Sequence, residues 1–102
     1  MRQERYQWLL DRVGEGGLPL TGAGYLEPTD VRAAFVDWGL EEEWVGTGTR
    51  EVQTLPVYQV REGAMALRLL RRYKGRLLLT RLGAQARRDP EVLRAQLARL
   101  VD

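Results

Sequence analysis

The sequence predicts a mainly α-helical domain of four to five helices with a minimal two-stranded β element, winged-helix-like in its layout. Three observations predict this fold class. Apolar residues recur at helical spacing in several segments, glycine or proline stands at most segment ends, and the phrase Leu-x-Leu-Thr-x-x-Gly occurs twice. The length of 102 residues fits a single domain, 1–102, with a first half at 1–54 and a basic second half at 55–102.

The first half is expected to contain two amphipathic helices. Gly14 begins the glycine cluster that ends the first helix, and Trp8 lies on the side opposite the apolar stripe of that helix. Pro28 suits the first turn of the second helix, and Gly39 ends it. Both stripes repeat at i, i+3, i+4 and i+7: Tyr6, Leu9, Leu10 and Val13 in the first helix, and Val31, Ala34, Phe35 and Trp38 in the second.

A long helix is expected to begin near Leu55. Its best-defined part is Ala64–Tyr73, where apolar residues occupy one half of the helical wheel and arginines the other. For Lys74-Gly75 two interpretations stay open. The pair either ends this helix, which we favour, or turns a tight hairpin between Leu70 and Leu77.

The last part of the chain predicts a strand at Arg76–Leu79 followed by two helices. Thr80 can cap the first of them, which runs to Arg88. Asp89 then serves as N-cap for the second, with Pro90 at the first helical position. The last helix has the apolar stripe Leu93, Leu97 and Leu100.

The repeated phrase predicts that two short strands pair with each other. Its copies begin at Leu18 and Leu77, and in each copy the two leucines face one side of a strand. The threonine can bond backbone at the end of the strand, and the glycine allows a sharp turn. Because an isolated strand leaves backbone groups unpaired, we expect Leu18–Leu20 and Leu77–Leu79 to be neighbours. Pro19 places the first strand at an edge of the sheet.

The residue types that the chain lacks argue against catalysis. It contains no cysteine, histidine or serine, so thiol and serine nucleophiles and histidine-ligated metals are excluded. We therefore expect no enzyme, no cofactor and no metal. The absence of cysteine suits a reducing cytoplasm, and no apolar run approaches the roughly 18 residues of a membrane span, so no membrane partner is expected.

Charge is divided unevenly along the chain. Residues 1–60 hold five basic and ten acidic residues, whereas residues 61–102 hold eleven basic and four acidic ones. This asymmetry favours a non-catalytic binding module whose basic end contacts nucleic acid, although the two halves attracting each other within the fold is an open alternative. The candidate nucleic-acid-binding residues are Arg68, Arg71, Arg72, Lys74, Arg76 and Arg81. Since Tyr73 is expected on the apolar side, contact with a duplex backbone is favoured over base stacking.

The alternative function is that of a protein-interaction or structural domain, with a protein partner or a second copy of the chain. Trp8 is its candidate contact, because a tryptophan outside the apolar stripe is either covered by the chain itself or marks a partner surface. Glu41–Glu43 form an expected acidic patch, which either stays solvated or pairs with the arginines. Residues 46–50 lack the spacing and lysine of a phosphate-binding loop and are expected to be plain surface.

Two groups of residues follow a pattern seen in one protein family. Leu20, Thr21, Gly24, Leu26, Pro28, Val31 and Arg32 match its first part, and Arg71, Arg72, Gly75, Leu77, Leu79, Thr80, Gly83, Asp89 and Pro90 match its second. On these residues the chain resembles the C-terminal region of actinobacterial plasmid open-reading-frame-three-like proteins, also described as insertion-element passenger proteins. The resemblance implies a domain of a longer mobile-element-associated protein and no settled activity.

Overall fold

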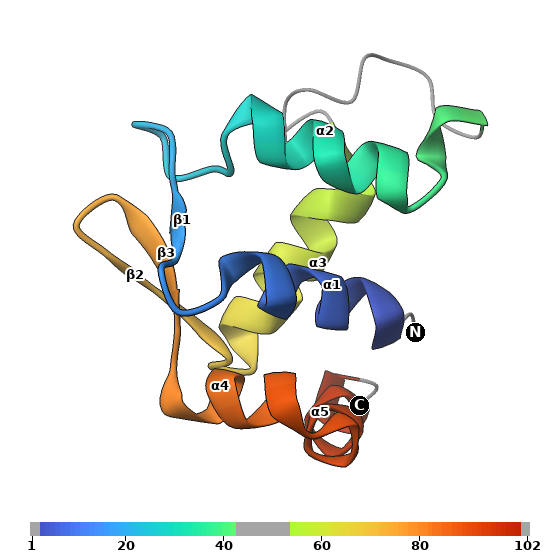
Figure 1. Ribbon diagram of the computed structural model, residues 1–102, viewed down its shortest axis with the longest axis vertical. Helices are drawn as coiled ribbons and strands as arrows, with labels where there is room; N and C mark the ends of the chain where they lie inside the picture. Colours follow the sequence, from blue (N-terminus) through green and yellow to red (C-terminus); the bar gives the residue numbers. More distant parts are fainter. Residues whose placement is uncertain (1–2, 43–53, 101–102) are drawn as a thin grey trace.

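The computed structural model describes residues 3–42 and 54–100. Within them the chain forms five α-helices and a three-stranded antiparallel sheet, so the predicted mainly helical fold with a small β element is confirmed (Figure 1). The elements follow in the order α1 (Gln3–Val13), β1 (Leu18–Pro19), α2 (Pro28–Asp37), η1 (Leu40–Glu42), α3 (Leu55–Ala66), β2 (Leu70–Tyr73), β3 (Arg76–Leu79), α4 (Arg81–Arg88), α5 (Pro90–Leu97) and η3 (Ala98–Leu100).

Helix α1 lies at the centre of the molecule and packs against α3, α4, α5 and β3. The four residues of its predicted stripe are all buried, and Leu10 is completely inaccessible. Helix α2 adds Val31, Ala34 and Phe35, which are also buried. The apolar spacing of both helices therefore predicted their core faces correctly, since residues at i, i+3, i+4 and i+7 share one side of a helix.

The two copies of the repeated phrase pair as predicted. Leu18 lies opposite Leu77 and Pro19 opposite Arg76 in the antiparallel pair of β1 and β3. Strand β1 is at the edge of the sheet, whose order is β1-β3-β2. It is shorter than expected, since it ends at Pro19. The N–H of Leu20 still donates to the Gly75 carbonyl at 2.8 Å, and Leu20 also forms an isolated bridge with Leu26.

The prediction of a helix at Ala64–Tyr73 was wrong. Helix α3 ends at Ala66, and Leu70–Tyr73 forms strand β2, which pairs with β3 and makes the sheet three-stranded rather than two-stranded. The disfavoured alternative for Lys74-Gly75 is the observed one: both residues have positive φ, 50° and 75°, and they form the two-residue loop of a hairpin. Positive φ at both central positions is the mark of a type I′ turn, whose twist matches that of paired strands.

The end of α3 explains why the helix stops among good helix formers. Arg68 adopts a left-handed backbone with φ of 61°. Its N–H donates to the carbonyl of Met65 at 3.0 Å, and the N–H of Leu69 donates to the carbonyl of Ala64 at 2.9 Å. This pair of bonds is a Schellman motif, which satisfies the last carbonyls of a helix and reverses the chain. Leu69 is then fully buried, so tertiary packing overrides local helix propensity.

The predicted caps of the last two helices are confirmed. The Thr80 side chain accepts a hydrogen bond from the Gly83 N–H at 2.9 Å, and the Asp89 side chain accepts one from the Glu91 N–H at 3.0 Å. Leu93 and Leu97 are buried in the core, whereas Leu100 is exposed because the chain has left α5 for the η3 turn. In the part of the chain that the structure describes, no helix has both the length and the apolar character to cross a bilayer.

A candidate nucleic-acid interface on a basic hairpin

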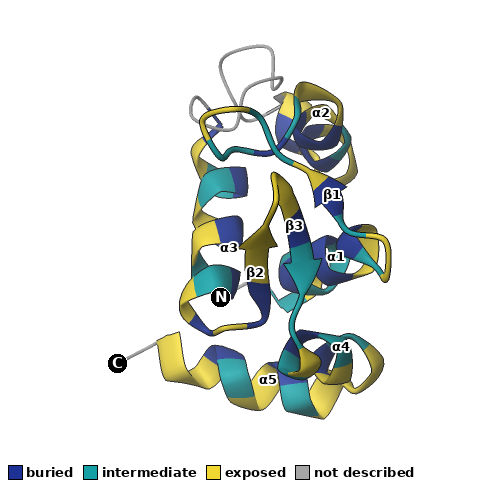
Figure 2. Ribbon diagram, turned by 90° about the vertical axis from the view of Figure 1, so that its left-hand side faces the viewer, coloured by how far each residue is buried: buried dark blue, intermediate teal, exposed yellow. Residues whose placement is uncertain are grey.

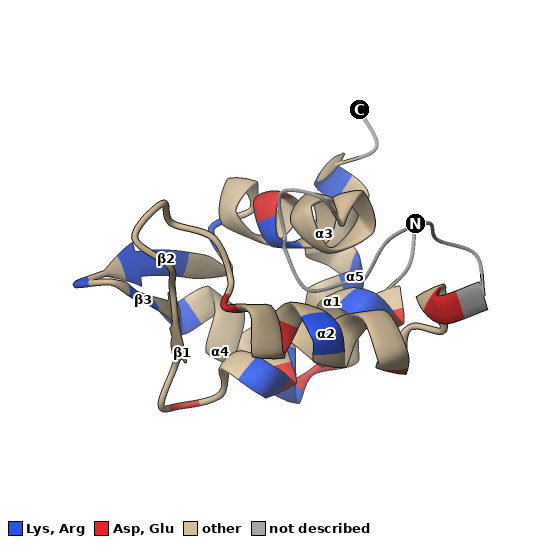
Figure 3. Cartoon of the chain, turned by 90° about the horizontal axis from the view of Figure 1, so that it is seen from above, with Lys and Arg blue, Asp and Glu red and all other residues tan. Residues whose placement is uncertain are grey.

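Four of the six predicted cations lie on one exposed hairpin, here called the basic hairpin: strands β2 and β3 with the Lys74-Gly75 turn. It carries Arg71, Arg72, Lys74 and Arg76 and no acidic residue. The hairpin projects from the helical body (Figure 1), and β2 is exposed beyond its first residue (Figure 2). Arg68 and Arg81 flank its base, because one precedes β2 and the other opens α4. The prediction that Arg68, Arg71 and Arg72 share one helix face was wrong, because Arg68 precedes the hairpin and the other two lie on strand β2. Figure 3 shows the cations of the two strands gathered at this end of the molecule.

The strand register divides the hairpin into two faces. Paired residues of an antiparallel ladder point to the same side, and neighbours along a strand point to opposite sides. Arg72 pairs with Leu77, which is fully buried, so Arg72 lies on the inner face. Tyr73 pairs with Arg76 on the outer face, which Arg71 shares.

Tyr73 lies among the cations rather than on the apolar side. Its side chain is 52% exposed. The Arg71 guanidinium carbon is 5.4 Å from the centroid of its ring, and the Lys74 ammonium is 5.3 Å from it. The ring therefore holds two cations on the outer face by cation–π attraction. The expectation that this surface has no aromatic residue was wrong, and base stacking is no longer disfavoured on that ground.

In the part of the chain that the structure describes, the six cations share with Arg88 and Arg99 the absence of a carboxylate partner. None of them forms an ion pair within residues 3–42 and 54–100, whereas Arg12, Arg32, Arg61, Arg87 and Arg94 each pair with a carboxylate. Glu41 pairs with Arg32 at 3.3 Å rather than with the hairpin. The Glu42 side chain, Glu43 and residues 46–50, to which other predictions referred, lie outside what the structure describes. The described acidic groups thus leave the charge of the hairpin uncompensated.

Arg76 has a structural contact of its own. Its guanidinium donates to the carbonyls of Gly16 and Gly17 at 3.0 and 3.2 Å. These carbonyls belong to the loop between α1 and β1, so Arg76 ties the hairpin to the helical body. Gly17 fits against the same strand, because a Cβ there would lie 2.5 Å from a Leu78 methyl carbon.

Trp8, the other predicted site residue, lies in what we call the tryptophan corner: Glu4, Arg5, Trp8, Asp37 and Trp38, which line a cavity of about 290 Å³. The Trp8 indole donates to Asp37 Oδ2 at 2.7 Å and meets Trp38 edge-to-face, with centroids 5.5 Å apart. Arg5 and Arg12 lie over the rings of Trp38 and Trp8 at 5.1 and 5.4 Å. Trp8 is therefore largely covered by the end of α2, and packing within the chain accounts for its position outside the stripe.

The core of the described residues contains one ionisable group of note, the Tyr6 phenol. Burial raises the pKa of the Tyr6 phenol above its usual value of 10.0, and Tyr6 packs in the core against Gly63. Residues 3–42 and 54–100 contain no group of three or more acidic side chains placed to hold a metal ion.

Comparison with protein-family models, curated proteins and solved structures finds no match for this chain. The resemblance to the plasmid and insertion-element proteins therefore remains a prediction.

Proposed function

We propose that the protein is a non-catalytic module that binds duplex nucleic acid, with the basic hairpin as its main contact. The observation that carries this proposal is the gathering of six cations without carboxylate partners on and beside one projecting ribbon. Such cations gain most from phosphate groups, because each contact releases condensed counterions. A two-stranded ribbon is also narrow enough to enter a groove of the duplex.

The order of elements supports the same proposal. Helix, strand, helix, helix, strand, strand, with the first strand paired to the last, resembles the layout of a winged helix, in which the final hairpin would be the wing. Two features depart from that pattern. Residues 38–54 separate α2 from α3, where a helix-turn-helix has a turn of about three to four residues. The exposed residues of α3 are Leu55, Gln59, Glu62 and Ala66, none of them a cation. The hairpin rather than α3 is therefore the proposed contact.

The alternative, a protein-interaction or structural domain of a longer mobile-element-associated protein, has less support from the described surface. Trp8 was its proposed anchor, and the indole N–H of Trp8 already has a partner in Asp37. A cytoplasmic location suits the nucleic-acid proposal and is kept as part of it.

The test is a salt titration of binding to a labelled blunt duplex of mixed sequence. The test variant combines Arg71→Gln, Lys74→Asn and Arg81→Gln. The control variant combines Arg88→Gln, Arg94→Gln and Arg99→Gln, which removes the same charge from exposed positions of α4, α5 and η3. We expect the hairpin variant to lower the slope of log K against log salt by about two to three units.

The control variant should keep the slope close to that of the wild type. An equal loss in both variants would mean that overall charge, not the hairpin, governs binding. Absence of duplex binding by the wild type at ~50 mM salt, where phosphate contacts are strong, would overturn the proposal.

A further inference from the structure

A groove lies behind the basic hairpin, on the inner face that carries Arg72. It consists of two cavities that share Ala23, Gly24 and Arg72. The first, of about 310 Å³, lies between the Thr21–Gly24 turn and the tip of the hairpin. The second, of about 350 Å³, continues toward α3 and is lined by Tyr25 and Tyr58. Each cavity reaches the lower part of the usual range for small-molecule pockets.

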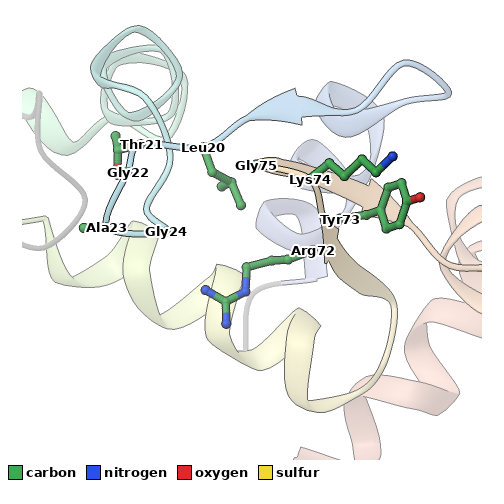
Figure 4. Close-up of a pocket in the computed structure, with 9 residues that line it drawn as sticks. All are labelled: Leu20, Thr21, Gly22, Ala23, Gly24, Arg72, Tyr73, Lys74 and Gly75. Carbon is green, nitrogen blue, oxygen red and sulfur yellow. The ribbon is translucent and has the colours of Figure 1, made fainter.

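Arg72 stands where the two cavities meet. Its side chain extends from β2 toward the Thr21–Gly24 turn, whereas Tyr73 and Lys74 extend the other way (Figure 4). The fit to the turn is close, because a Cβ on Gly24 would lie 2.7 Å from Arg72 Nη1. Gly24 also has φ of 88°, a conformation that glycine adopts easily. Glycine is therefore favoured here both by the backbone of the turn and by the close contact with Arg72.

The first cavity has the chemistry of an anion site. Arg72 supplies a charged, forked donor that forms no ion pair within residues 3–42 and 54–100. The N–H groups of Gly22 and Ala23, in the turn that faces it, make no hydrogen bond to described residues. Both residues are exposed, so their N–H groups are accessible to a ligand as well as to water. A guanidinium and accessible backbone N–H groups lining one cavity are a combination that favours phosphate.

The second cavity has the chemistry of a site for an aromatic ring. The Tyr25 and Tyr58 rings have centroids 6.2 Å apart and are tilted by 48°. Arg61, only 4% exposed, lies 5.9 and 5.7 Å from these centroids and pairs with Glu62 at 3.2 Å. A base can stack on tyrosine, and a half-exposed carboxylate can accept a hydrogen bond from the exocyclic amine of a base.

We propose that this groove binds one nucleotide, with its phosphate against Arg72 and the Thr21–Gly24 turn and its base against Tyr25 and Tyr58. The polarity follows from the charges: at the α3 end Glu62 and Arg61 pair with each other, whereas Arg72 at the other end forms no ion pair with a described residue. The inference rests on the proposed function, because an unpaired nucleotide of a bound strand would reach the groove from the hairpin. A free mononucleotide has the same chemistry and is the second source to be tested.

The experiment compares two labelled probes: a blunt duplex and the same duplex with a three-nucleotide 3′ overhang. We expect the wild type to bind the overhang probe about tenfold more tightly, the gain typical of stacking one base. Arg72→Gln should bring this ratio close to one. Arg71→Gln is the matched control, since it removes the same charge from the adjacent residue on the opposite face. It should weaken both probes equally and keep the ratio.

A second variant tests the base end of the groove. Tyr58→Leu keeps an apolar side chain at this partly buried position and should also lower the ratio, while thermal unfolding reports that the fold is kept. A mononucleotide (AMP, GMP, CMP or dTMP) is also added as a competitor of the overhang probe, at ~5 mM because a site for one nucleotide binds weakly. Competition would support the groove and would show that it accepts a free nucleotide. Equal affinity of the wild type for both probes would overturn the groove and leave the hairpin proposal standing. Absence of binding to either probe would overturn both.

Discussion

The basic hairpin and the tryptophan corner both bring cations and aromatic rings together, but the chain uses them differently. In the corner, Arg12 pairs with Asp30, Trp8 donates to Asp37, and the two indoles meet edge-to-face. In the hairpin, backbone contacts hold the ribbon in place, while its four cations have no carboxylate partner among the described residues. Groups that contribute to stability already have their partners. Cations without a carboxylate partner are available to bind a ligand. Because such cations gather on the hairpin and not in the corner, we propose the hairpin as the interface.

The largest expected effect tests the claim that backbone fit holds the hairpin. Gly83 lies in the first turn of α4, and a Cβ there would come within 1.9 Å of the Leu69 carbonyl oxygen at the base of β2. Since neither backbone can move freely, Gly83→Ala should lower the free energy of unfolding by about 3 kcal/mol. Urea denaturation measures this loss.

The matched control is Gly22→Ala, in the other copy of the repeated phrase. A Cβ at Gly22 would meet no atom within 4 Å, and its φ is not positive. Its stability should change by less than about 1 kcal/mol. Gly83 is argued to matter because it allows a close approach to Leu69, not because glycine is flexible. Similar losses of unfolding free energy in Gly83→Ala and Gly22→Ala would refute this.

Gly24 and Gly83, which end the two copies of the repeated phrase, also show how far the sequence could predict the fold. The repeated phrase predicted the pairing of Leu18 with Leu77 and the cap at Thr80, because alternation and capping are local patterns. The phrase could not show that its glycines act differently. Gly24 provides a left-handed backbone and space for Arg72, whereas Gly83 allows α4 to touch Leu69. Such close approaches depend on segments distant in the chain.

For the candidate interface, the sequence predicted which cations lie together but not the backbone that carries them, a hairpin instead of a helix. Leu69, Leu70 and Tyr73 suit a helical stripe as well as a strand, so periodicity alone could not decide between them. The usual turn signals were also partly missing. Arg68 occupies a left-handed position that glycine usually takes, and Lys74 stands where a type I′ turn prefers asparagine, aspartate or glycine. The Lys74-Gly75 pair was the available signal, and it was interpreted as a helix end.

A smaller effect is expected in the tryptophan corner. Trp8→Ala removes a partly buried ring, its contact with Trp38 and the hydrogen bond to Asp37. We expect unfolding to become easier by about 2 to 3 kcal/mol, less than for a fully buried tryptophan. Trp8→Phe should cost about 1 kcal/mol, since it keeps most of the packing and loses the hydrogen bond.

Affinity for the blunt duplex should stay unchanged in the folded Trp8 variants. A variant with native stability that fails to bind a partner or changes its oligomeric state would reverse the assignment of the two surfaces. Thermal unfolding, the binding titration and light scattering on the same samples distinguish these outcomes.

The smallest expected effect concerns the cations themselves. Arg68 has a left-handed backbone with φ of 61°, at a position where a helix end prefers glycine. Arg68→Gly should therefore stabilise the protein by about 0.5 to 1 kcal/mol while weakening duplex binding, because it relieves backbone strain and removes a proposed phosphate contact. Arg68→Ala removes the same charge but keeps a Cβ in the left-handed region, so it should weaken binding without the gain in stability. If Arg68→Ala raises the free energy of unfolding as much as Arg68→Gly does, backbone strain is not the cause. The gain would then come from weaker repulsion among the cations, and the charges on and beside the hairpin would lower the stability of the protein.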